Sequence, residues 1–240
     1  MLLQGGAAIP QVRRQHRGLS PINNAVYDNA PSPAARAATE NRQMQAELKQ
    51  LAGWENIFER NAIIPSLLVL FISFAITAVS IFLPTLAKTY NISNIGMFFT
   101  FQAVALGFSQ FTIGKLSKWL GTTAVIIVSF IMLTISLLGI FFFRSLTILL
   151  ALAVLYGMGM GFSMPTLNSL AVYKSPPNRR GKANATYYMA VDFGIGVGSA
   201  AWGVIADFSG IKWVFFFAAM IPLLTIFIFL AVQPKKVPVL

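Results

Sequence analysis

The sequence predicts an all-α membrane protein of six transmembrane helices, arranged as two inverted three-helix repeats. Composition is the first observation: 56% of the 240 residues are hydrophobic and 10% are charged, whereas an average soluble domain has about 25% charged residues. The second is a series of six apolar runs after Arg60, each close to the ~20 residues that a helix needs to cross the hydrocarbon core. The third is a similar glycine-containing stretch at the ends of the second and fifth runs.

Residues 1–60 differ from the rest of the chain. They contain 7 of the 18 Lys and Arg residues and 5 of the 7 acidic residues. Met44, Leu48 and Leu51 recur at spacings of four and three, so an amphipathic helix within 33–50 is one interpretation. The other is a polar tail with little stable structure, because such a segment buries too little apolar surface to fold. We expect a polar, partly disordered cytoplasmic tail.

The apolar runs define a predicted transmembrane bundle at 61–233, followed by a short cytoplasmic tail at 234–240. In order, the runs are 62–85, 96–114, 122–143, 146–172, 183–206 and 213–232. A large soluble protein can bury one or two such runs as core helices, but six in succession indicate lipid as the solvent. The lipid bilayer is therefore the first expected partner.

The basic residues predict that both chain ends are cytoplasmic. With the N-terminal tail in the cytoplasm, 15 of the 18 Lys and Arg residues fall on that side, and only Lys88, Arg144 and Lys212 fall on the other. This bias follows the positive-inside rule. We therefore expect a multi-pass protein of the plasma membrane. Topology accounts for the net charge of +11, so no nucleic-acid partner is expected.

The residue inventory argues against an enzyme. The chain has no cysteine, and its single histidine, His16, lies in the polar tail. No metal site or cofactor is indicated. Intramembrane hydrolysis needs a pair of catalytic groups, such as two acids or Ser with His. The apolar runs contain one deep acid, Asp192, and no histidine.

Two short stretches suggest the internal repeat. "GKLSKWLG" ends the second run at Gly114–Gly121, and "GVIADFSG" ends the fifth at Gly203–Gly210. They close the middle run of each three-helix group on opposite sides of the membrane, as inverted repeats would. We expect the first glycine of each pair to permit close helix packing and the second to permit a tight turn. Asp207 is expected to pair with a cation or cap a helix. A plain turn is the alternative.

The region around the fifth run resembles a known family. Its motifs are Pro-Pro-x-Arg-Arg-Gly from Pro176 to Gly181, Asp-x-Gly-x-x-x-Gly from Asp192 to Gly198, and Gly-x-x-x-Asp-x-x-Gly from Gly203 to Gly210. They resemble the tenth and eleventh transmembrane helices of the major facilitator superfamily, in particular its proton-coupled drug and small-solute exporters. The resemblance extends from about residue 55 to the C-terminus. It implies half of a major-facilitator fold, with the six runs as helices seven to twelve.

That resemblance also implies a function. We expect secondary active transport of a small-molecule substrate by alternating access, as proton-coupled efflux through an antiporter. A second six-helix bundle, from a separate chain or a homodimer, is needed to complete the pathway. Alternatively the chain is a truncated C-terminal half, which is the expectation we favour. A non-transporting membrane scaffold or assembly subunit is the competing hypothesis.

Asp192 is the first candidate for a proton or substrate site. It lies about ten residues into the fifth run, which at about 1.5 Å per residue places it about 15 Å deep, near the midplane. Acidic residues at this depth usually face a cavity or a partner, and a protonatable site is expected because no Lys or Arg lies within the run. The alternative is an acid that serves packing and is hydrogen-bonded to Ser or Tyr.

Other polar residues extend the predicted proton and substrate pathway: Gln102, Gln110, Asn168, Tyr156 and Tyr188. Their alternative role is hydrogen bonding between helices. Gly157, Gly161, Gly194 and Gly198 lie within apolar runs, so we expect close packing or bending rather than a phosphate loop. Arg179 and Arg180 are expected to determine orientation, with a gating role as the second hypothesis.

Overall fold

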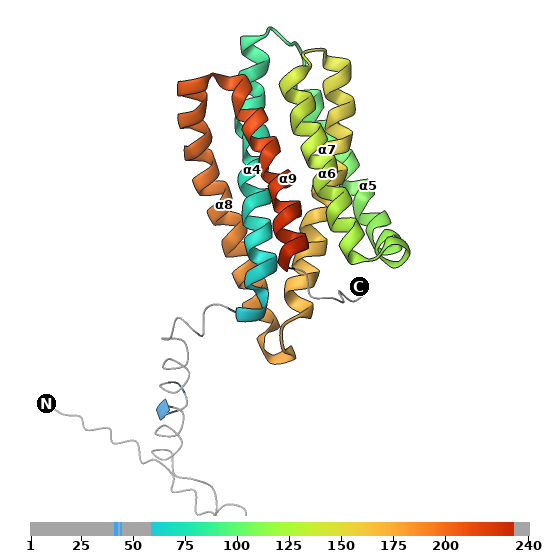
Figure 1. Ribbon diagram of the computed structural model, residues 1–240, viewed down its shortest axis with the longest axis vertical. Helices are drawn as coiled ribbons and strands as arrows, with labels where there is room; N and C mark the ends of the chain where they lie inside the picture. Colours follow the sequence, from blue (N-terminus) through green and yellow to red (C-terminus); the bar gives the residue numbers. More distant parts are fainter. Residues whose placement is uncertain (1–40, 43, 45–58, 233–240) are drawn as a thin grey trace, which may run out of the picture. The chain divides into compact units, whose positions relative to one another are not determined.

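The computed structural model describes residues 41, 42, 44 and 59–232. The predicted tails 1–60 and 234–240, and the amphipathic helix predicted within 33–50, lie almost wholly outside the described residues. Residues 59–232 form a helical bundle (Figure 1). Its elements are η1 (Arg60–Ala62), α4 (Ile63–Thr89), α5 (Gly96–Leu120), α6 (Thr122–Phe142), α7 (Leu146–Tyr173), η2 (Pro177–Arg179), α8 (Arg180–Ser209) and α9 (Ile211–Val232).

The six predicted transmembrane helices are confirmed within the described residues. Each of α4 to α9 is long and apolar enough to cross a membrane. The shortest has 21 residues and the longest has 30, which meets or exceeds the ~20 that a bilayer requires. Helix α5 continues to Leu120, beyond the predicted end at Gly114, and takes in Lys115 and Lys118. Lysines are tolerated there because long side chains at a helix end reach the interface.

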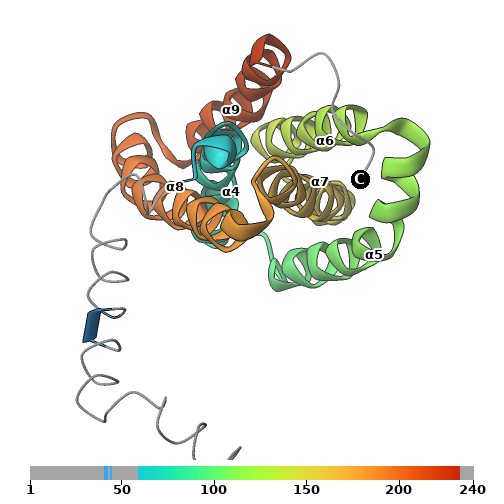
Figure 2. The same ribbon diagram turned by 90° about the horizontal axis from the view of Figure 1, so that it is seen from below.

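The two three-helix groups, α4–α6 and α7–α9, are interlocked: most contacts of each group are with helices of the other. Helix α4 packs along α8, and α7 packs along α5, so the first helix of each three-helix group lies against the second helix of the other (Figure 2). Similarly, α9 packs on α4 and α6 packs on α7, while α6 and α9 pack on each other. If α4 is exchanged with α7, α5 with α8 and α6 with α9, the same set of contacting pairs results. This contact pattern is the one that two inverted three-helix repeats produce.

Helices α5 and α8 are the least buried of the six. In the most apolar window of each, 17% of residues are buried, compared with 61% for the span that contains α4. They lie at the two sides of the bundle, flanking α4 and α7 (Figure 2). Equivalent helices of the two repeats therefore share an exposed position, and the apolar core lies mainly among α4, α6, α7 and α9.

Glycines end the two middle helices. Helix α5 stops at Gly121 (φ +81°) and α8 stops at Gly210 (φ +89°), the two glycines expected to permit tight turns. Positive φ is strained for residues that carry a Cβ, so glycine suits both positions. At the turn between α4 and α5, Asn91 and Asn94 adopt positive φ instead, and Asn tolerates this conformation better than most residues.

Charge divides the two ends of the bundle. The end at which α4 begins also carries the α5–α6 and α7–α8 turns (Figure 1), and we call it the basic end. Its described basic residues are Arg60, Lys115, Lys118, Lys174, Arg179, Arg180 and Lys182. The opposite end carries Lys88, Arg144 and Lys212. Two of these opposite-end cations lie over aromatic rings: Arg144 over Tyr90 and Lys212 over Trp213.

Candidate functional site: the exposed polar face of α8

Helix α8 carries two different exposed stripes. Polar residues recur at spacings of four, four and seven: Asn184, Tyr188, Asp192 and Ser199, none of which is buried. Large exposed apolar residues recur at four, four, seven and four: Met189, Phe193, Val197, Val204 and Phe208. One further exposed apolar residue, Ile195, lies on the side of the polar residues, between Asp192 and Ser199. The two stripes are offset by five residues, which is about 140° around a helix. We call them the polar stripe and the apolar stripe. The opposite, wider side of the helix, which carries Tyr187, Gly194 and Gly198, packs on α4 and α7.

Asp192 lies at the middle of the polar stripe. It is residue 13 of the 30 in α8, so its depth agrees with the expected position near the centre of the span. Its side chain is exposed, and within the described residues it makes no hydrogen bond or ion pair. The described helices therefore supply neither the Ser or Tyr partner of the packing interpretation nor a buried pocket around the carboxylate. Any surface that covers Asp192 must face this bundle from outside it.

A polar hollow lies at the basic end of the polar stripe. It has a volume of about 370 Å³ and is lined by Asn168, Ser169, Val172, Tyr173, Arg180 and Asn184. The Oδ1 atom of Asn168 is buried and accepts no hydrogen bond from the described residues. Because an unsatisfied buried acceptor costs about 1–3 kcal/mol, this oxygen has a strong tendency to bind water or a solute donor. The hollow joins α7 to the polar stripe through Asn184.

Helix α5 contributes two amides. Gln102 is partly buried, with its Nε2 atom 3.6 Å from the sulfur of Met160 on α7. Its Oε1 atom is buried and has no partner among the described residues. Gln110 is exposed two turns further along. Gln102 and Asn168 therefore share one property, a buried carbonyl oxygen that no described donor satisfies.

The two predicted pathway tyrosines have different surroundings. Tyr156 is fully buried, and its hydroxyl donates a hydrogen bond to the carbonyl oxygen of Ile76 at 3.1 Å. It therefore links α7 to α4 and does not reach the exposed face, in contrast to the expected cavity position. Tyr188 is 51% exposed and packs edge-on against Tyr187, with ring centroids 5.4 Å apart. Tyr188 thus belongs to the polar stripe.

Four of the predicted packing glycines lie at close helix contacts. A Cβ added to Gly157 of α7 would lie 3.0 Å from the Cβ of Ala105, and one added to Gly194 of α8 would lie 3.0 Å from the Cβ of Ser73. One turn along, Gly161 meets Ser109 and Gly198 meets Thr77. Small residues let these helix backbones approach closely.

These contacts give the register of the repeats. Gly194 of α8 occupies the same place in the α4–α8 contact as Ala105 of α5 does in the α5–α7 contact, and the two positions are 89 residues apart. Gly157 and Ser73 are likewise equivalent and differ by 84 positions. The contacts one turn along give the same two offsets. In one interface the glycine is on the first helix of its repeat, and in the other it is on the second.

Gly114 and Gly203 differ from this pattern and from the expectation. A Cβ added to either would meet nothing within 4 Å among the described residues, so neither glycine serves close packing there. Both lie in the last two turns of their helices, α5 and α8. Asp207 is exposed in the last turns of α8 and forms no ion pair within 59–232. Its equivalent in α5, at the offset of 89, is Lys118.

An ion pair at the basic end was not predicted. Arg179 Nη1 lies 3.4 Å from Glu59 Oε2, and Glu59 also accepts a hydrogen bond from Asn61 Nδ2 at 3.1 Å. The Glu59 amide donates to Thr186 Oγ1 at 3.1 Å, which ties the chain before α4 to α8. Arg179 thus has a structural partner, whereas Arg180 lines the polar hollow. In the sequence, the only indication of this ion pair was the position of Glu59, an acid just before the first apolar run.

Comparisons with known proteins agree with this architecture. A sequence model described as Major Facilitator Superfamily matches residues 30–240. The chain is similar to the Staphylopine export protein of Staphylococcus aureus, with 26% identity over 165 residues, covering 67% of this chain and 42% of that protein. It is also similar to an uncharacterized MFS-type transporter of Methanocaldococcus jannaschii, with 30% identity over 145 residues, covering 58% of this chain and 36% of the relative.

The matched regions thus span 42% and 36% of the two curated relatives. The family match covers every helix of the bundle, and the interlocked pairs α4–α8 and α5–α7 provide the inverted repeats that the resemblance implies. The chain is therefore a multi-pass membrane protein, and it belongs to the Major Facilitator Superfamily.

Proposed function

We propose that the six-helix unit forms one wall of a pathway that exports a small solute, and that Asp192 exchanges a proton during the transport cycle. The two stripes of α8 carry this proposal. A carboxylate at the bilayer centre costs at least about 2.5 kcal/mol on the insertion scale when it faces lipid. The polar stripe therefore suits a water-filled or protein-lined space, whereas the apolar stripe suits lipid.

The second wall would come from another six-helix bundle. Helices α5 and α8 are apolar enough to span a membrane yet least buried within this bundle, so a further protein surface could cover α8 on the side of its polar stripe. The curated relatives extend well beyond the matched region, which supports a pathway built from more than these six helices. The second bundle belongs to the same protein, to a separate chain or to a second copy. Rocking of the two bundles would expose the polar stripe to each side in turn.

The basic end is proposed to face the cytoplasm of the cell. Seven described basic residues lie at this end and three at the opposite end. Positively charged loops are retained on the cytoplasmic side during insertion. The solute would then enter beside Arg180 and Asn184 in the polar hollow and pass Tyr188 and Asp192 along α8.

Staphylopine is the first solute to test, because a relative of the chain is named as its exporter. The full chain, combined with its second bundle, would be reconstituted in vesicles that contain a pH-sensitive dye, with a pH gradient as the driving force. We expect staphylopine flux coupled to proton movement in the unsubstituted protein and no coupled proton movement in Asp192→Asn. Asp207→Asn is the matched control, because it removes the other acid of α8 at the helix end.

Three outcomes separate the hypotheses. Coupled flux that survives Asp192→Asn would exclude the proton-exchange role while leaving transport in place. Staphylopine flux that is absent while another small solute is carried would reject only the named solute. A non-transporting scaffold or assembly subunit would show no flux of any solute when combined with its second bundle.

A further inference from the structure

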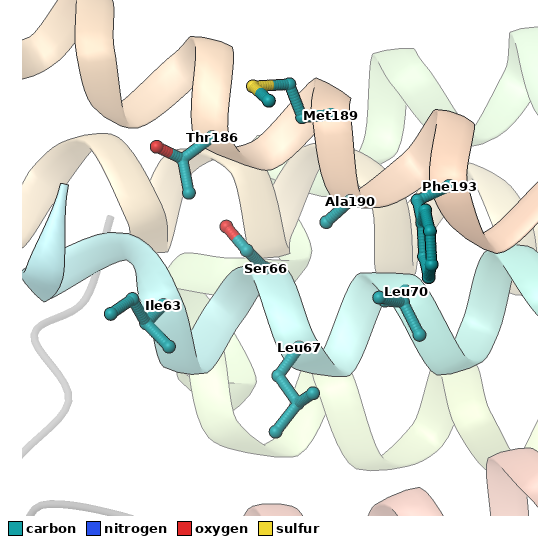
Figure 3. A pocket seen from close by; sticks show the side chains of 8 residues that line it. All are labelled: Ile63, Ser66, Leu67, Leu70, Thr186, Met189, Ala190 and Phe193. Carbon is teal, nitrogen blue, oxygen red and sulfur yellow. The ribbon is translucent and has the colours of Figure 1, made fainter. Parts of the chain in front are cut away.

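A groove runs between α4 and α8 at the basic end of the bundle. It has a volume of about 370 Å³ and is lined by residues of both helices, with Ser66, Ala190 and Phe193 lying between the two ribbons (Figure 3). They are Ile63, Ser66, Leu67, Leu70, Thr186, Met189, Ala190 and Phe193. Met189 and Phe193 belong to the apolar stripe of α8. The groove therefore opens on the side of α8 that carries large exposed apolar residues, away from the polar stripe.

Two cations flank the basic end of this groove. Lys182 precedes Thr186 by four residues and Met189 by seven, so it shares their face of α8 one turn closer to the helix start. Arg60 lies in η1, three residues before Ile63, on the α4 side. Within the described part of the chain neither cation forms an ion pair, and the nearby carboxylate of Glu59 is bound by Arg179 and Asn61.

The second repeat provides an internal comparison. An equivalent groove of about 360 Å³ lies between α5 and α7, and it includes Phe101 and Val104, the equivalents of Ala190 and Phe193 at the offset of 89. At the same offset Ser93 takes the place of Lys182. The equivalent of Arg60, at the offset of 84, is Arg144, whose guanidinium already donates to the carbonyl oxygens of Ile140 and Phe143. The two grooves thus have similar volumes and apolar walls but differ in their available charge.

We propose that the α4–α8 groove binds an anionic phospholipid of the cytoplasmic leaflet. One acyl chain lies along Leu70 and Phe193, and the phosphate lies beside Arg60 and Lys182. Basic clusters between transmembrane helices on the cytoplasmic side are suited to anionic headgroups. An acyl chain in the groove also makes van der Waals contact with its apolar walls. The proposal needs the membrane placement of the bundle and its orientation, but not the transport activity.

The chain offers a clean probe of this site because it contains no cysteine. Leu67→Cys in the full chain places a single fluorophore label at the groove, where the native side chain is 44% exposed. Val104→Cys labels the equivalent groove, where the native side chain is 69% exposed. Each labelled protein is reconstituted in phosphatidylcholine vesicles that contain a small fraction of nitroxide-labelled phosphatidylglycerol or nitroxide-labelled phosphatidylcholine.

We expect the label at position 67 to be quenched more by phosphatidylglycerol than by phosphatidylcholine. The label at position 104 should be quenched equally by both. Arg60→Gln and Lys182→Gln should each reduce the preference at position 67 by about fivefold in relative affinity, because a cation at the membrane surface contributes that much to anionic lipid binding. Lys118→Gln, at the same end but on α5, should leave the preference unchanged. In the protein with both cations present, high salt should weaken the preference for phosphatidylglycerol at position 67, because salt screens the attraction between the cations and the headgroup.

Two results would overturn the proposal. Equal quenching by both lipids at position 67 in the unsubstituted protein, at low salt, would show that the groove does not select an anionic headgroup. Quenching by neither lipid at position 67, with normal quenching at position 104, would show that a protein segment such as a helix of the second bundle covers the groove. Neither result depends on whether the protein transports a solute.

Discussion

Glu59 and Arg179 form an ion pair of 3.4 Å although 120 positions separate them, and the two side chains differ in burial. The side chain of Glu59 is 3% exposed, whereas that of Arg179 is 43% exposed. The pair fastens the chain before α4 to the α7–α8 turn. Removal of Arg179 therefore leaves a buried carboxylate without its cation, whereas removal of Glu59 leaves an arginine that water can reach.

Arg179→Gln should therefore destabilise the bundle more than Glu59→Gln. Loss of the arginine leaves a buried carboxylate without its cation, which costs about 1–3 kcal/mol. Loss of the acid leaves an arginine that water can solvate, and this costs at most about 1 kcal/mol. The midpoint of thermal unfolding in detergent measures the order of the two variants. Arg180→Gln is the control at the neighbouring exposed position, and equal losses in the two test variants would contradict the asymmetry.

The glycines of α8 give a matched pair of substitutions. A Cβ at Gly194 would lie 2.5 Å from the carbonyl oxygen of Leu70, whereas a Cβ at Gly196 would meet nothing within 4 Å. Gly194→Ala should separate α8 from α4 and lower stability by about 1–3 kcal/mol, as overpacking does. Gly196→Ala should be neutral or raise stability by up to about 1 kcal/mol, because alanine favours a helix. Thermal unfolding of both variants tests this, and a harmless Gly194→Ala would refute the close contact.

The two stripes of α8 should differ in access to water. Asp192→Cys and Phe193→Cys place single thiols at nearly the same depth on different stripes of an otherwise cysteine-free chain. A water-soluble thiol reagent should modify position 192 about tenfold faster or more, because the reactive thiolate forms only where water reaches it. Ser199→Cys and Val197→Cys should repeat the contrast. Mass spectrometry of membranes after timed labelling gives the rates, and equal rates on both stripes would leave the proposed pathway without its water-accessible surface.

Lys174 predicts a dependence of stability on pH. Burial lowers the pKa of this side chain from its ordinary value of 10.5. Between the lowered pKa and 10.5 the unfolded chain binds more protons than the folded chain, so stability rises with pH across that window. Lys174→Met should remove this rise and stabilise the protein at pH values below the window. Thermal midpoints in the alkaline range measure the slope, with Lys118→Met as the exposed-lysine control. An unchanged slope in Lys174→Met would assign the rise to other groups.

Much of the architecture was predictable from local sequence. The six spans followed from apolar runs, since lipid offers the backbone no hydrogen-bond partner and a helix satisfies its own. The ends at Gly121 and Gly210 followed from glycine chemistry. The depth of Asp192 followed from counting residues along one continuous helix. Each of these properties depends on residues that are neighbours in the chain.

Contacts between distant segments were not predictable in the same way. Close packing was predicted for both Gly157 and Gly114, but among the described residues only Gly157 lies against another helix. Tyr156 was expected in the pathway because its type suits a cavity, yet the rotation of α7 directs its hydroxyl to Ile76. Glu59 gave no sign that its partner lay 120 positions away.

Within residues 59–232, the sequence by itself determined the number of transmembrane helices, the ends of α5 and α8 and the division of charge between the two ends of the bundle. Only the tertiary structure decided that α4 pairs with α8 and α7 with α5, and hence that Asp192 faces outward while Met189 and Phe193 border a groove. The physical reason is that hydrophobicity specifies burial in lipid without specifying a partner. The partner is chosen by the fit of small residues, such as Gly194 against Ser73, across two helices far apart in the chain.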